Sequence, residues 1–303
     1  MPGPPRHRLP RTGWGEAMSE TVDDARAAAL PRRGFIMTSL IAGFTLATAR
    51  AEAAPIRTST QGLTAGPVAI PVADGTLPGY AARPDGAGPF PIVLVNEEIF
   101  GVHEYIKDVT RRLAKQGYLA VAPEYYARHG DLSTMTDAGQ IVRDVISKTP
   151  DAEVMADLDA AATWAAANHG DPTRLAVLGF CRGGRNTWLY AAHNPAVKAA
   201  VAFYGPLGGT PTPIQPRTAG DVAGEIHAPL LGLYGGQDQG IPATARQAAQ
   251  NKAEEAGKTV EIVVYPDAPH GFHADYRPSY RQADAEDAWN RALAWLQRYD
   301  TGA

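Results

Sequence analysis

The sequence is poor in cysteine, in excess charge and in long apolar runs. Its 303 residues contain one cysteine, Cys181, so no disulfide can form within the chain and this thiol needs another explanation. With a formal net charge of -4, the protein lacks the positive electrostatic field that attracts nucleic-acid phosphates, so we expect no nucleic-acid partner. The histidines lack metal-ligand spacing and a lone cysteine cannot build a zinc site, so we expect no metal and no other cofactor.

The rest of the composition is that of a soluble globular protein. Hydrophobic residues make up 45% of the chain and charged residues 20%, which is enough for one large core and a single catalytic domain. The 31 glycines and 25 prolines fall mostly between apolar runs, where they indicate turns.

The first 53 residues have the pattern of an export signal. Arg32 and Arg33 precede a short apolar run at residues 38–48, and alanines follow at positions 49, 51, 53 and 54. This order is typical of a twin-arginine signal peptide, and the run is too short to cross about 30 Å of hydrocarbon as a stable membrane anchor. Met18 offers a second possible start of translation.

We therefore expect residues 1–53 to be removed by processing and residues 54–303 to form the catalytic domain. The twin-arginine export machinery would be a partner, and the mature protein would be periplasmic or secreted. A cytoplasmic location is the alternative.

From residue 66 onward, short β-branched runs alternate with longer alanine-rich amphipathic runs. This alternation predicts an α/β fold, with a mostly parallel central sheet and helices on both faces. Strands are predicted at residues 67–72, 91–95, 118–122, 174–178, 199–203, 229–234 and 260–265. Helices are predicted at residues 102–116, 153–169, 183–194, 242–256 and 280–299.

Residues 125–151 are polar and less regular, as in a cap or substrate-binding loop. Tyr125, Tyr126 and Arg128 are candidate pocket residues in this segment. Surface packing explains these three side chains equally well.

A nucleophile elbow is predicted around Cys181. A predicted strand leads into residues 179–184, which read GFCRGG, and a helical pattern follows. The flanking glycines suit a tight strand-to-helix turn, and the helix N-terminus favours the reactive thiolate. A buried cysteine that packs as a small hydrophobe is the alternative.

Two partners for this thiol follow in chain order. Asp238 comes after a predicted strand, and His270 lies in a loop between the last strand and the last helix. The order nucleophile, acid, histidine is that of α/β-hydrolases. An ordinary turn or capping role is the alternative for Asp238, while Asp267 and His273 are weaker candidates for the acid and the base.

These residues predict nucleophilic catalysis by a Cys-His-Asp triad. His270 would take the thiol proton and pass a proton to the leaving alkoxide, while Asp238 fixes the histidine tautomer. Backbone N–H groups of Ile99 and Arg182 are the candidates for the oxyanion hole.

Together with residues 96–101, which read NEEIFG, the Cys181, Asp238 and His270 elements make the sequence resemble the dienelactone hydrolase (carboxymethylenebutenolidase) family. The resemblance spans residues 66–299. It implies an α/β-hydrolase fold and cleavage of a small ester or lactone. It also implies that Glu98 assists the thiol as an auxiliary base or electrostatic partner, whereas a solvated carboxylate at a strand end is the alternative.

The sequence departs from the family at the substrate anchor. The family's arginine shortly after the catalytic histidine is replaced in register by Ala274, and Arg277 lies three residues further on. Arg277 is a candidate to bind a substrate carboxylate, or else to pair with an acid such as Asp275. A catalytically silent binding protein and a hydrolase of another electrophile are the competing functional hypotheses.

Overall fold

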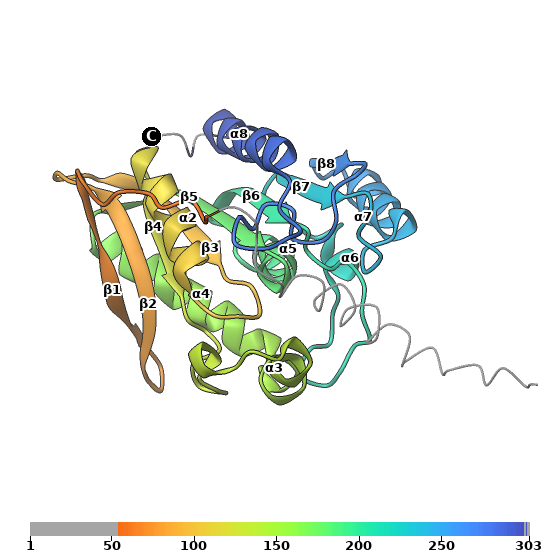
Figure 1. The fold of residues 1–303 in the computed structure, drawn as a ribbon, viewed down its shortest axis with the longest axis horizontal. Helices are drawn as coiled ribbons and strands as arrows, with labels where there is room; N and C mark the ends of the chain where they lie inside the picture. Colours follow the sequence, from red (N-terminus) through yellow and green to blue (C-terminus); the bar gives the residue numbers. More distant parts are fainter. Residues whose placement is uncertain (1–53, 300, 302–303) are drawn as a thin grey trace, which may run out of the picture.

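The computed structural model describes residues 54–299 and 301, and the predicted export signal lies outside this range. An eight-stranded sheet forms the centre of the molecule, in the order β1-β2-β4-β3-β5-β6-β7-β8 (Figure 1). The strands are β1 (Leu63–Val72), β2 (Gly75–Pro84), β3 (Phe90–Asn96), β4 (Leu119–Pro123), β5 (Gly170–Phe180), β6 (Val197–Phe203), β7 (Leu230–Gly235) and β8 (Val260–Tyr265).

The sheet is antiparallel at one edge and parallel elsewhere. Strand β2 runs antiparallel to both β1 and β4, and the pairs from β4 and β3 through β8 are parallel. This topology confirms the predicted mostly parallel α/β-hydrolase fold. Strand β2 was not predicted, because its glycines and prolines interrupt the β-branched pattern that marks the other strands.

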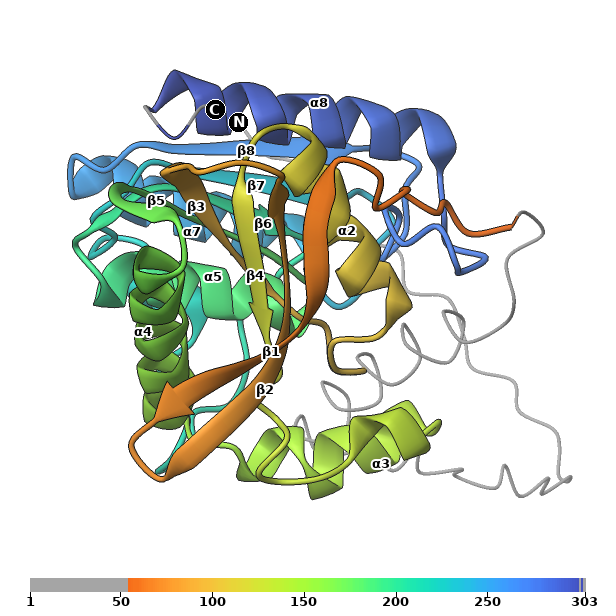
Figure 2. The same ribbon diagram turned by 90° about the vertical axis from the view of Figure 1, so that its left-hand side faces the viewer.

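Helices cover both faces of the sheet. They are α2 (Glu104–Lys115), α3 (Ala138–Asp144), α4 (Asp151–Ala167), α5 (Arg182–His193), α6 (Ala219–Val222), α7 (Ala243–Glu255) and α8 (Gln282–Arg298), with short 3-10 turns at η1 (Leu132–Thr134) and η2 (Ile146–Lys148). Figure 2 shows α2 and α4 on opposite sides of β1, β2 and β4. Among the described residues, no helix combines the length and apolar character needed to cross a bilayer.

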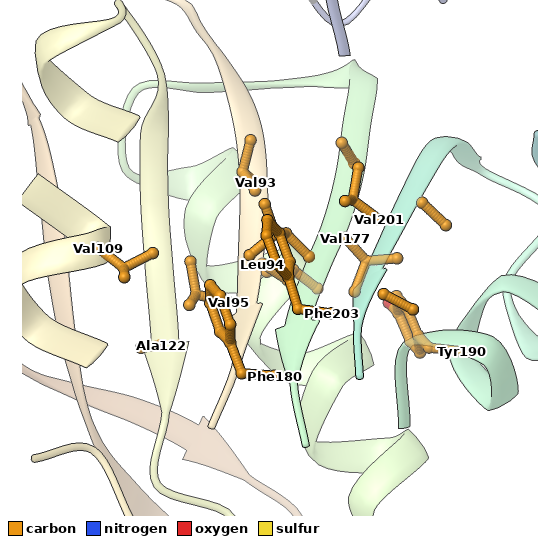
Figure 3. Close-up of a cluster of buried hydrophobic side chains, with 14 of the residues drawn as sticks. Val93, Leu94, Val95, Val109, Ala122, Val177, Phe180, Tyr190, Val201 and Phe203 are labelled. Atoms are coloured by element: carbon orange, nitrogen blue, oxygen red, sulfur yellow. The ribbon is translucent and has the colours of Figure 1, made fainter. Parts of the chain in front are cut away.

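The hydrophobic core lies on both faces of the central parallel strands. Nearly every residue of β3, β5 and β6 near the sheet centre is buried, which explains why these strands read as continuous apolar runs. Figure 3 shows Val93, Leu94 and Val177 with Phe180 and Phe203 among the buried side chains of this core.

The predicted cap segment, residues 125–151, is built from the two 3-10 turns and α3. The Asp131 and Asp137 carboxylates accept the backbone N–H groups of Ser133 and Gln140, at 3.0 Å and 2.6 Å, and so begin η1 and α3. These caps explain how a polar and irregular sequence forms defined short helices.

The parallel strands place the candidate site residues at one edge of the sheet. Cys181 directly follows β5, and Glu98 lies two residues beyond β3, its neighbour in the sheet. The strands up to β4 lie on one side of β3 and the strands from β5 onward on the other. α/β proteins bind their ligands at such a switch point.

Candidate active site

Cys181 occupies a strained turn between β5 and α5. Its backbone angles are φ 53° and ψ −119°, in a region that residues other than glycine rarely adopt. Its N–H donates to the Phe203 carbonyl at 3.0 Å, and the residue is 1% exposed. The turn places Cys181 directly after β5, at the edge of the sheet where the parallel strands end.

The glycines around Cys181 are required by close backbone contacts. A Cβ atom at Gly179 would lie 2.4 Å from the Gly183 carbonyl oxygen. A Cβ atom at Gly183 would lie 2.3 Å from the Asn96 carbonyl oxygen, so α5 begins directly against the end of β3. The elbow motif therefore also fixes the distance between the loops that follow β3 and β5.

The structure brings Asp238 and His270 together. His270 Nδ1 lies 2.6 Å from Asp238 Oδ2, and both residues are buried. The Gly240 N–H donates to the other carboxylate oxygen at 2.9 Å, which fixes the orientation of Asp238. The ring of Tyr204 packs edge-on against the His270 imidazole, with centroids 5.1 Å apart.

The charge environment of His270 favours its protonated form. Burial alone lowers the pKa of His270, but the Asp238 carboxylate and Cys181 raise it more, so the pKa lies well above its usual value. Cys181 is therefore one of the groups that favour the protonated imidazole. A histidine with this environment can hold the proton of a neighbouring thiol.

The two competing residues lie in other surroundings. Asp267 is exposed, whereas Asp238 is the buried carboxylate that contacts His270. His273 is buried in the aromatic core, with Nδ1 at 2.7 Å from the Tyr105 hydroxyl, and burial followed by nearby Arg112 lowers its pKa to about 3. A histidine that stays neutral in the core is a poor candidate for the base.

Glu98 is a fully buried carboxylate surrounded by donors. Its Oε2 atom lies 2.8 Å from the Tyr276 hydroxyl, 3.2 Å from Arg277 Nη2 and 3.4 Å from His103 Nε2. Burial raises the pKa of Glu98, but Arg277 and His103 lower it by more, so that the pKa falls to about 2. The solvated-carboxylate alternative for Glu98 is therefore wrong.

Arg277 is fully buried between the rings of Phe100 and Tyr276, each 4.8 Å from its guanidinium carbon. It pairs with Glu98, and the alternative pairing with Asp275 is wrong, because Asp275 instead forms an ion pair with Arg112. The Nε and Nη1 atoms of Arg277 have no hydrogen-bond partner among the described residues.

A second glutamate at the site was not predicted. Glu97 is fully buried beside Glu124, and neither of its carboxyl oxygens has a hydrogen-bond partner with normal geometry in the described structure. Burial and then the Glu124 carboxylate raise the pKa of Glu97 well above its usual value. The signal in the sequence was the pair of consecutive glutamates after a buried strand, whose side chains point in opposite directions.

The Arg128 guanidinium forms ion pairs with two carboxylates. Its guanidinium binds Asp157, at 2.6 Å and 2.9 Å, and Asp74 in the β1–β2 turn, at 2.9 Å and 3.0 Å. These contacts join the hairpin to α4. Substrate binding by Arg128 stays a prediction, while the observed contacts are structural.

The remaining predicted site residues surround the elbow. Tyr125 and Tyr126 are buried, with ring centroids 4.7 Å apart. Ile99 follows Glu98 in the loop after β3, and Arg182 is the first residue of α5. Within the described residues, no cluster of three or more histidine, cysteine, aspartate or glutamate side chains is arranged to hold a metal ion.

Comparisons with known proteins agree with this architecture. The model of the dienelactone hydrolase family matches residues 77–300. A relative from Methylorubrum extorquens named "Putative carboxymethylenebutenolidase" is 55% identical over 91% of this chain and 95% of its own. A Bradyrhizobium protein named "Probable 2-oxo-3-(5-oxofuran-2-ylidene)propanoate lactonase" is 34% identical over 72% of this chain and 88% of its own.

A solved structure supports the same assignment. The "Putative Dienelactone Hydrolase from Klebsiella pneumoniae subsp. pneumoniae MGH 78578" superposes with a TM-score of 0.77 and 51% identity, over 78% of this chain and 99% of its own. Agreement in sequence and in fold over most of the described domain carries the conclusion. The chain belongs to the dienelactone hydrolase family and is a carboxymethylenebutenolidase-like hydrolase.

Proposed function

We propose that the protein hydrolyses a small ester or lactone through a Cys181 thiolate, with His270 as the base and Asp238 as its partner. The observation that carries this proposal is the buried His270, whose Nδ1 lies 2.6 Å from Asp238 and whose pKa is raised by both Asp238 and Cys181. The strained elbow at Cys181 supports it, because such strain collects at functional sites.

The reaction would proceed in two steps. His270 accepts the thiol proton, and the thiolate attacks the carbonyl carbon to give a tetrahedral oxyanion. The oxyanion collapses to a thioester as the C–O bond breaks, and the alkoxide takes the proton from His270. His270 then takes a proton from water, which attacks the thioester, and the thiolate leaves and regains its proton.

Two backbone donors would stabilise the oxyanion. The N–H of Arg182 belongs to the first turn of α5, where backbone N–H groups have no partner within the helix. The N–H of Ile99 lies in the loop that α5 contacts after β3. Donors placed at a developing negative charge contribute on the order of 10²–10³ in rate.

Glu98 and Arg277 would form an electrostatic unit beside the thiol. Burial lowers the pKa of Arg277, whereas Glu98 and, to a smaller extent, Tyr276 and Cys181 raise it, which supports a role for this cation beside the thiol. Glu98 holds this cation in position, and the free Nε and Nη1 donors of Arg277 are available to a substrate oxygen. The lactonase name of the Bradyrhizobium relative supports a lactone or a similar ester as substrate.

The lone cysteine makes this proposal direct to test. Iodoacetamide can alkylate no other thiol, so hydrolysis of dienelactone and activated esters should be lost in proportion to the modified fraction seen by mass spectrometry. Cys181→Ala should reduce kcat/KM by about 10³-fold or more. Equal hydrolysis by the folded variant would overturn the thiol mechanism.

A further inference from the structure

A buried ion-pair cluster joins α2 to the loop that carries Arg277. Arg112 on α2 binds Asp108 through Nε at 2.6 Å and Asp275 through Nη2 at 2.5 Å, and both carboxylate side chains are at most 3% exposed. Burial raises the pKa of Asp275, and Arg112 opposes that shift. The pair joins two residues that lie 163 positions apart in the sequence, and the mechanism proposed above does not use it.

The turn at Asp275 holds two of the side chains that contact Glu98. The Arg277 N–H donates to the Ala274 carbonyl at 3.1 Å, so Asp275 and Tyr276 are the central residues of a tight turn. The Tyr276 hydroxyl lies 2.8 Å and Arg277 Nη2 lies 3.2 Å from the same Glu98 oxygen. The ion pair at Asp275 therefore fixes one residue of a turn whose next two residues bind Glu98.

The segment before β1 completes this cluster. The Thr58 N–H donates to Asp108 at 2.5 Å, and the Thr58 carbonyl accepts Arg111 Nε at 3.1 Å. The backbone of Ile56 also hydrogen-bonds Asp275. Figure 2 shows this orange segment beside α2 and the blue loop that precedes α8. The match to the family model starts only after this segment, so the family pattern does not imply these contacts.

We propose that the segment before β1 and the Arg112–Asp275 ion pair form a latch that positions the following turn on Glu98. The members of the latch are positioning residues, because they act on the site only through this turn. The inference rests on the proposed hydrolysis, in which Glu98 and Arg277 support the thiol. A turn that moved away would leave the buried Glu98 carboxylate without two of its partners, which is costly in a protein interior.

Hydrogen exchange followed by mass spectrometry tests the latch without any substrate. Thr58→Pro removes the N–H that binds Asp108 and removes no titratable group. With the full chain, exchange should become about 10-fold faster at residues 271–281 and keep the wild-type rate in β5 and β6, because local opening leaves the sheet intact. Ser59→Pro is the matched control, because Ser59 is exposed and its N–H makes no hydrogen bond within the described structure.

Ester hydrolysis reports whether the turn supports the thiol. Thr58→Pro and Asp275→Asn should each reduce kcat/KM for an activated ester by about 10- to 100-fold, since small displacements of groups near the reacting atoms are costly. The double variant should lose no more than the larger single loss, because both changes open the same latch. Arg291→Gln, which breaks an exposed ion pair on α8, should keep the wild-type rate.

The pH dependence separates positioning from a general loss of stability. Arg277 and His103 outweigh burial and hold the pKa of Glu98 at about 2, so this carboxylate stays ionised well below neutral pH. When the turn moves away, burial raises that pKa, and the ratio of Thr58→Pro to wild-type kcat/KM should fall as pH is lowered from about 7 to about 5. His103 and the other titratable groups are the same in both proteins, so their own titration cancels in the ratio.

The outcomes distinguish the latch from the proposed function. Unchanged exchange at residues 271–281 in Thr58→Pro, or faster exchange throughout the sheet, would overturn the latch. A loss of kcat/KM that is equal at every pH would also overturn it. A wild type that hydrolyses no ester would overturn the proposed function, whereas the exchange result would still decide whether the latch holds the turn.

Discussion

Glu97 and Glu98 are adjacent residues of one type whose pKa values the structure shifts in opposite directions. Glu98 stays ionised, because Arg277 and His103 outweigh its burial and bring its pKa to about 2. Glu97 faces Glu124 instead of a cation, so burial and then the like charge of Glu124 raise its pKa well above the usual value and favour the protonated carboxyl. The two pKa values differ because the side chains of these consecutive residues point in opposite directions, toward different neighbours.

We predict that Glu97→Gln stabilises the protein increasingly as pH rises. The folded state binds the Glu97 proton more tightly than the unfolded state, so stability is fully present below the unfolded pKa of about 4.3 and is lost as pH rises toward the folded pKa. The loss is about 1.4 kcal/mol per pH unit in that window, and glutamine removes it. Urea unfolding at several values between pH 5 and 8 measures the difference.

Glu261→Gln is the matched control, because Glu261 is exposed on β8. Its free energy of unfolding should track that of the wild type across the same pH range. If the Glu97→Gln and wild-type curves ran parallel, Glu97 would not carry a raised pKa.

At this scale the sequence predicted the contact between Asp238 and His270 but not the ion-pair partners of the arginines. That contact was predictable because both residues follow parallel strands, and the carboxyl ends of such strands share one edge. The partners of Arg128 and Arg277 lie 29 and 179 residues away in Asp157 and Glu98. That choice depends on packing that no local pattern contains.

The elbow between β5 and α5 joins the thiol to the end of β3. We predict that Gly183→Ala destabilises the protein by about 1–3 kcal/mol and reduces ester hydrolysis, because its Cβ would lie 2.3 Å from the Asn96 carbonyl and 2.4 Å from the Glu97 carbonyl. Backbone atoms must then move, and with them the loop that carries Glu98 and Ile99. Denaturant midpoints and initial rates measure the two effects.

Gly208→Ala is the control for this prediction. Gly208 is exposed in the loop after β6, its φ is not positive, and a Cβ atom there would meet nothing within 4 Å. Its stability and rate should match the wild type. A Gly183→Ala protein with wild-type stability and rate would contradict this prediction, because the backbone of α5 and β3 would then shift without measurable cost.

The elements were predictable where the apolar pattern is regular. The predicted strand at 260–265 and the predicted helix at 183–194 agree with β8 and α5 to within one residue. Strand β2 was missed because its pairing with β1 is held by a hairpin, with Val72 opposite Gly75, and not by a buried apolar run. The short α3 was missed because side-chain caps at its start, more than periodicity, define it.

The whole molecule is needed to assemble the active site. Its reactive and supporting groups come from the loops after β3, β5, β7 and β8, and the contact between Glu98 and Arg277 spans 179 residues. Closing a loop of this length costs conformational entropy, which the other contacts of the folded sheet must offset. The thiol and its candidate partners are therefore brought to one site by the folded domain and by no single segment.

A domain assembled in this way suits export after folding, which is what the sequence predicts for this chain. The lone cysteine means that no disulfide has to form in an oxidising compartment, so folding before export loses no covalent link. We predict that replacing Arg32 and Arg33 together with lysines stops export and leaves the uncleaved chain in the cytoplasm, whereas Arg11→Lys, outside the motif, has no effect. Cell fractionation with N-terminal mass spectrometry reads both results. A paired-lysine variant that still reached the periplasm with residues 1–53 removed would refute the twin-arginine route, while an intact wild-type N-terminus in the cytoplasm would establish the cytoplasmic alternative.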